Sequence, residues 1–151
     1  MRTSAVALAA TLCCVAAVAA DDKPNFNGVW KHSDGASWVV VTIDHQEPNL
    51  RIAYESRFSA GTLSGGLSGA GNYIADGVER AGDGNNRRAS WTTVNWQGPA
   101  LVILRVTRDG YRVVVTREAW TLSGDGRTLT KDKRTIDMDD VTESSQVFRK
   151  Q

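Results

Sequence analysis

The chain has 151 residues, and its 18 lysines and arginines are balanced by 17 aspartates and glutamates, which gives a formal net charge of +1. This balance, with both signs interspersed along the chain, excludes the broad basic surface of a general nucleic-acid-binding protein. Both cysteines, Cys13 and Cys14, lie near the start, so we expect neither a disulfide nor a thiolate metal site in the rest of the chain.

Residues 1–20 have the pattern of a secretory leader. Met1 and Arg2 form a short cationic start, an apolar run extends over 5–18, and small residues at 17–20 precede Asp21 and Asp22. The apolar run is shorter than the roughly 20 residues that a membrane-spanning helix needs. We therefore predict a signal peptide at 1–20, one mature domain at 21–151 located in the periplasm or secreted, and no stable membrane insertion.

The mature chain is dominated by a hydrophobic period of two. Tyr54 and Phe58 share the apolar face of one segment, and Arg51, Glu55 and Arg57 lie on its other face. Such alternation is typical of a β-strand with one buried side. β-Branched residues are plentiful and no segment has a helical period, so we expect an all-β chain. After a first strand at 28–31, strands are predicted at 37–45, 49–58, 72–76, 87–96, 100–108, 111–122, 128–138 and 143–149.

The connections between these segments are short and contain the residues that tight turns favour, so consecutive strands should pair. The sequence therefore predicts an up-and-down antiparallel meander. Closing that meander would remove both exposed edges and create an interior. We expect a closed barrel of about eight or nine strands, with a two-sheet sandwich as the alternative.

The glycine-rich stretch 59–86 is the irregular part of the pattern, and Tyr73 and Ile74 are its only strong strand signal. Ordering a long glycine-rich segment costs conformational entropy. We expect either a lid at the barrel mouth or a surface excursion.

Residue sets for catalysis or metal binding are sparse. The chain has two histidines, His32 and His45, and no cysteine after the leader, so a nucleophile with an orienting base is not indicated. Scattered acids with two histidines do not have the spacing of a metal site. We predict no enzyme activity, no metal and no cofactor.

Several motifs carry a family resemblance. They are Asn25-Phe26-x-Gly28-x-Trp30-Lys31, Trp96-x-Gly98-x-x-Leu101-Val102-Ile103, Arg117-Glu118-x-Trp120-Thr121-Leu122-Ser123-x-Asp125-Gly126-x-Thr128-Leu129-Thr130, and a closing Val147-Phe148-x-Lys150. Together they resemble the secreted bacterial lipocalin-like, calycin-type β-barrels, most of them functionally uncharacterised. The resemblance spans almost the whole mature chain, and the third motif is the most specific.

This resemblance implies structural roles at the first strand. In lipocalins the first-strand tryptophan closes the barrel base and an arginine from the last strand covers it. Trp30 would be that tryptophan, Gly28 would also be structural, and Arg149 or Arg134 would supply the cation.

A weaker similarity to avidin-type barrels rests on Gly28-Val29-Trp30, Tyr54-Glu55-Ser56 and Trp120. Two polar positions that would bind biotin are altered, since His32 and Ala36 occupy them. A biotin binder is therefore a minor alternative.

One charged pair suggests a site. Glu118 shares a strand face with Trp120, and the next strand brings Arg134 to similar depth. If that face points inward, Glu118 should pair with Arg134, because an unpaired buried carboxylate is too costly. The pair would either stabilise the barrel or orient a ligand.

The leading functional hypothesis is an exported protein that binds a small, largely apolar molecule in the barrel lumen. Alternatively, the inward-facing side chains of the barrel simply fill its interior and leave no lumen. A second class is a secreted protein-binding barrel, such as an inhibitor of proteases or lysozymes, that uses its loops or the arm 21–25. The candidate lining residues are Tyr54, Phe58, Trp91, Ile103, Glu118, Trp120 and Arg134.

Overall fold

The computed structural model describes residues 23–82 and 88–151, which form ten strands and their connections. The predicted leader at 1–20 lies outside the described residues. Within the described residues, no helix is long and apolar enough to cross a membrane. The strands are β1 (Gly28–Asp34), β2 (Ser37–Gln46), β3 (Asn49–Ala60), β4 (Leu63–Ile74), β5 (Arg80–Ala81), β6 (Arg88–Gln97), β7 (Ala100–Asp109), β8 (Arg112–Leu122), β9 (Thr128–Asp137) and β10 (Asp140–Lys150).

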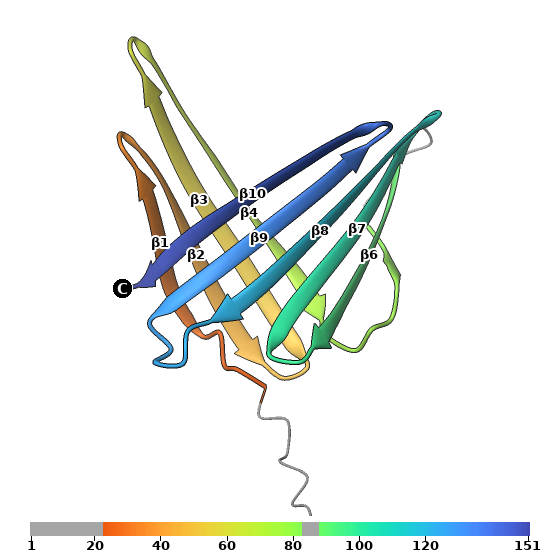
Figure 1. The fold of residues 1–151 in the computed structure, drawn as a ribbon, viewed down its shortest axis with the longest axis horizontal. Coiled ribbons are helices and arrows are strands. Elements are labelled where there is room, and N and C mark those ends of the chain that lie inside the picture. The colour runs from red at the N-terminus through yellow and green to blue at the C-terminus, as the bar shows by residue number, and fades with distance from the viewer. Residues whose placement is uncertain (1–22, 83–87) are drawn as a thin grey trace, which may run out of the picture.

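All ten strands belong to one antiparallel sheet in the order β4-β3-β2-β1-β10-β9-β8-β7-β6-β5. The predicted all-β meander is therefore confirmed, and the first and last long strands meet, with Trp30 opposite Lys150. Figure 1 shows the sheet curling into a barrel-like shape.

The expectation of a closed barrel with eight or nine strands is wrong. The sheet has ten strands, and its two edges are β4 and β5. The cause is local. Within the described residues, β5 contributes two residues beside β6, and the long strand β4 has no ladder partner on its outer side. We call the opening between β4 and the β5–β6 pair the seam.

The hydrophobic core fills one end of the barrel, which we call the base. Phe26, Trp30, Leu101, Leu129 and Phe148 are fully buried there. Smaller apolar side chains from β2, β3, β6 and β7 complete the cluster. Burial of this much apolar surface is the main stabilising contribution to the fold.

Trp30 is the centre of the base. Its indole Nε1 donates a hydrogen bond of 2.9 Å to the carbonyl oxygen of Phe26, and Lys150 Nζ lies 5.2 Å from its ring centroid. Neither Arg149 nor Arg134 supplies this cation, contrary to the expectation from the sequence. Residues opposite each other in an antiparallel pair share a face, so the partner of Trp30 is Lys150, and Arg149 belongs to the other face.

Gly28 also contacts Lys150. It has a φ of +141°, and a Cβ at this position would lie 2.9 Å from Lys150 Cε. Glycine tolerates both the backbone conformation and the close approach.

Residues 63–74 of the glycine-rich segment form the regular strand β4, which corrects the expectation that this part of the chain is irregular. β4 pairs with β3 along its whole length, from Asn49 opposite Ile74 to Ala60 opposite Leu63. Aromatic rings of β3 lie over the glycines: a Cβ on Gly69 would be 2.7 Å from Tyr54 Oη, and a Cβ on Gly65 would be 2.6 Å from Phe58 Cζ. The apolar surface that β4 lacks is thus supplied by its neighbour.

Candidate functional site

A cavity of about 720 Å³ lies inside the barrel above the base, and we call it the lumen. Its floor consists of Val41, Ile52, Ile103 and Trp120, which are all buried. Below the floor, Phe26, Trp30, Leu129 and Phe148 are fully buried and belong to the same hydrophobic cluster as the floor. The lumen is therefore a hollow on top of a solid core.

One wall of the lumen is uncharged. It is formed by β2, β3 and β4, and no side chain from these strands that lines the lumen carries a formal charge. Tyr54 and Leu67 provide much of its surface and are 47% and 69% exposed, so this apolar area is open to an occupant. The lining residues of this wall are Val39, Val41, Ile52, Tyr54, Ser56, Leu67, Gly69, Ala70, Gly71 and Tyr73.

The opposite wall is formed by β7 to β10 and contains every charged side chain that lines the lumen in the described part of the chain. Arg105, Lys131 and Lys133 are cationic, and Glu118 is the one carboxylate among the described lining residues. Glu118 Oε2 accepts a hydrogen bond of 3.1 Å from Trp120 Nε1, and Lys131 Nζ lies 5.5 Å from the Trp120 ring centroid. This wall therefore has an excess of positive charge facing the uncharged wall.

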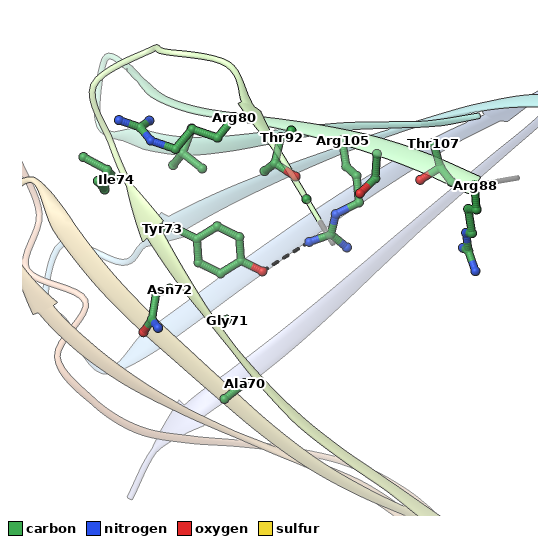
Figure 2. Close-up of a pocket in the computed structure, with 14 residues that line it drawn as sticks. Ala70, Gly71, Asn72, Tyr73, Ile74, Arg80, Arg88, Thr92, Arg105 and Thr107 are labelled. Carbon is green, nitrogen blue, oxygen red and sulfur yellow. Dashed lines mark hydrogen bonds between the residues drawn. The ribbon is translucent and has the colours of Figure 1, made fainter. Parts of the chain in front are cut away.

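The seam contains a second cavity of about 680 Å³. Figure 2 shows Tyr73 of β4 and Arg105 of β7 pointing toward each other across it, and Arg105 Nη2 donates a hydrogen bond of 3.2 Å to Tyr73 Oη. Tyr73 and Arg105 line both this cavity and the lumen, as do Ala70 and Gly71. The two cavities therefore adjoin at the Tyr73–Arg105 pair.

A polar cluster closes the base from below. The backbone N–H of Phe26 donates to His45 Nδ1 at 3.3 Å, and His45 Nε2 lies 3.0 Å from Glu47 Oε2. Burial raises the pKa of Glu47, but hydrogen bonds from Lys23, His45 and Trp96 outweigh it and hold that pKa below its ordinary value. His45 is the one buried polar or charged residue in the described chain, and its partners mark it as part of the closure of the base.

The structure brings four of the predicted lining residues together. Tyr54, Ile103, Glu118 and Trp120 all line the lumen. Phe58 lies farther up the same strand and lines a smaller cavity together with Trp38, near the tip of the β3–β4 hairpin. Whether any of them contacts a ligand stays a prediction.

Trp91 does not line the lumen. Its neighbours Ser90 and Thr92 both line the seam cavity. Because successive side chains of a strand point to opposite faces, Trp91 faces away from the interior.

The expected Glu118–Arg134 pair is not formed. Glu118 lies opposite Lys133, and Arg134 lies opposite Arg117 and Glu143. Arg134 Nε is 3.4 Å from Glu143 Oε1, and both side chains are largely exposed. A shift of one residue in the register exchanges the two faces of a strand, so Lys133 replaces Arg134 inside.

Arg105, Lys131, Lys133 and Tyr73 also line the lumen and were not predicted from the sequence. For the two lysines, the length of the preceding loop indicates which face they occupy. In the β8–β9 hairpin the Ser123 N–H bonds to the carbonyl of Thr128, so four residues form the loop. A loop with an even number of residues places odd-numbered side chains opposite even-numbered ones. Starting from Trp120 inside, this rule predicts Lys131 and Lys133 inside.

No group of three or more histidine, cysteine, aspartate or glutamate side chains suited to a metal ion occurs in residues 23–82 and 88–151. No protein-family model matches the chain, and no curated protein matches it. Among solved structures, a secretory abundant heat soluble (SAHS) protein of Ramazzottius varieornatus is similar at 13% identity and a TM-score of 0.49, with 83% of this chain and 94% of that chain covered. SAHS protein 4 of the same organism is similar at 10% identity and a TM-score of 0.47, with the same coverage.

Proposed function

We propose that this protein is an exported small-molecule-binding protein of lipocalin-like type that holds an amphipathic ligand in its lumen. The observation that carries this proposal is the division of the lumen into an uncharged wall on β2 to β4 and a charged wall on β7 to β10. The export part rests on the predicted leader at 1–20.

The size of the lumen supports the proposal. About 720 Å³ falls inside the range of roughly 300–1,000 Å³ that is typical of small-molecule sites. Tyr54 and Leu67 expose apolar surface to the lumen. Covering this surface with an apolar group of a ligand would favour binding by about 25 cal/mol per Å².

The charged wall refines the expectation of a largely apolar ligand. A wholly apolar molecule would remove water from Glu118, Lys131 and Lys133 without replacing their hydrogen bonds, which is costly. A ligand with one apolar side and one polar end avoids that cost. An amphipathic small molecule therefore fits both walls.

The test compares two neighbouring positions on β10. Gln146 lines the lumen, and Val147 is 48% exposed on the other face. We expect Gln146→Trp to fill the cavity and to weaken binding of a neutral amphiphile, dodecanol, by about tenfold or more, because the indole occupies the ligand volume. Val147→Trp should leave the affinity unchanged. Isothermal titration calorimetry measures both.

Native mass spectrometry of the purified wild-type protein provides an independent readout, since a bound small molecule should co-purify. Biotin serves as a further probe for the avidin-like alternative. If neither dodecanol nor biotin binds and no ligand co-purifies, the lumen is not a binding site and the proposal fails.

A second candidate function, binding of another protein, is favoured by one observation. The edge strand β4 has twelve residues with neither a charge nor a proline, the features with which proteins usually block sheet edges. An extended segment of a partner could add to this edge. Capture of one stoichiometric protein from the culture extract, lost when Ser68→Pro interrupts the edge, would support this alternative.

A further inference from the structure

Hydrogen bonds cross the seam both near the base and higher up. Near the base, the Gly77 N–H bonds to the carbonyl of Val94 at 2.8 Å. Higher up, the Arg105 guanidinium reaches Tyr73 Oη. Among the described residues β4 and β5 do not pair, and polar side chains form part of the lining of the cavity between them.

The Tyr73–Arg105 pair has hydrogen-bond donors to spare. Tyr73 Oη accepts from Arg105 Nη2, so its own O–H remains a donor. A guanidinium carries five N–H donors, of which this bond uses one. Ser90, Thr92 and Thr107 add hydroxyl groups along the same cavity. The seam is therefore rich in donors that converge on one space.

The charge of the seam has one sign. Arg80, Arg88 and Arg105 line the cavity, and no aspartate or glutamate does so within the described residues. Arg80 is neutralised by Asp76, with bonds of 2.8 and 2.7 Å to its two carboxylate oxygens. Arg105 instead bonds to an uncharged phenol. Arg105 thus brings positive charge to the point where the seam meets the lumen.

We propose that Arg105 and Tyr73 form the recognition site for an anionic oxygen group, a carboxylate, sulfate or phosphate, on the amphipathic ligand of the lumen. The anionic group binds in the seam, where it remains hydrated on one side, and the apolar part extends along the uncharged wall of β2 to β4. Planar guanidinium groups bind such oxyanions through two parallel N–H bonds. This inference rests on the proposed function.

The experiment uses a matched series of twelve-carbon probes below their micelle-forming concentrations: dodecanoate, dodecyl phosphate, neutral dodecanol and cationic dodecyltrimethylammonium. We expect the wild-type protein to bind an anionic probe at least about tenfold more tightly than dodecanol, as charge-assisted hydrogen bonds imply. The anionic advantage should fall as salt is added, because Arg105 is exposed. Comparison of the carboxylate with the phosphate identifies the preferred oxyanion.

Two variants locate the anion. Arg105→Gln should lower the affinity for the preferred anion by about tenfold, so that the preference for this anion over dodecanol is lost. Tyr73→Phe should cost about threefold for the same probe, because one neutral donor is lost. The matched control is Arg108→Gln on the same strand, whose guanidinium Nε bonds to the carbonyl of Gly110 and which does not line the seam or the lumen.

The outcomes separate this inference from the proposed function. If dodecanol and the anions bind equally well, the anion site at Arg105 does not exist. If Arg105→Gln leaves the anionic preference intact, the anion binds elsewhere, at Lys131 and Lys133. Either result overturns the inference while lumen binding stands. If no probe of any charge binds, the proposed function itself fails.

Discussion

Trp30 is the residue on which the base of the barrel depends. It is fully buried, its indole N–H is satisfied by the Phe26 carbonyl, and its ring is covered by Lys150 rather than by Arg149. A large aromatic residue in such a place contributes through apolar burial and through the hydrogen bond that its burial requires.

We predict that Trp30→Ala lowers the free energy of unfolding by about 3–5 kcal/mol, because it leaves a large cavity beside Phe26 and Phe148. Arg149→Ala should change it by less than about 0.5 kcal/mol, because Arg149 is exposed on the outer face. Urea unfolding followed by circular dichroism measures both. A larger loss of unfolding free energy for Arg149→Ala than for Trp30→Ala would contradict the finding that Lys150, and not Arg149, covers the Trp30 ring.

At the scale of the element, β4 shows how a strand of weak propensity is held by its neighbour. Its glycines leave room for rings from the interior face: a Cβ on Gly69 would lie 2.7 Å from Tyr54 Oη, which is closer than real Cβ contacts occur. Gly124, in the β8–β9 loop, has nothing within 4 Å of a built Cβ and is the natural control.

We predict that Gly69→Ala destabilises the protein by about 1–2 kcal/mol, because Tyr54 must leave its position over the strand. Gly124→Ala should be neutral or slightly stabilising, since it reduces the freedom of the unfolded chain without a clash. Removing the ring in Tyr54→Ala should abolish the penalty at Gly69, giving a coupling of at least about 0.5 kcal/mol in a double-mutant cycle of urea unfolding. Equal effects at Gly69 and Gly124 would show that the ring does not lie over the glycine.

Strands in which apolar and polar residues alternate were predictable from the sequence. A strand whose apolar contacts come from side chains of its neighbour was not. The segment 100–108 was predicted within a residue of β7, because Leu101, Ile103 and their neighbours carry the period themselves. Only the end of β4 was predicted, as part of the strand at 72–76, because the rings that pack on its glycines belong to β3. Glu118 and Trp120 were placed on the correct wall, whereas Arg134 was not, because the face of β9 depends on one residue of loop length.

At the scale of the whole molecule, the first strand, β1, pairs with the last strand, β10, whereas the edge strands β4 and β5 leave the sheet open at the seam. The closure between β1 and β10 brings the two halves of the chain around one interior. The same arrangement sets the uncharged lumen wall of β2 to β4 against the charged lumen wall of β7 to β10. The short strand β5, which ends the sheet beside β6, leaves the seam as the lateral opening of that interior.

The most direct test is a crystal structure of the full mature chain grown with dodecanol. The alkyl chain should lie in the lumen between the uncharged wall at Tyr54 and the floor at Trp120, with the side chains of the base unmoved. A lumen filled by its own side chains, with dodecanol absent or bound only on the outer surface, would contradict the account.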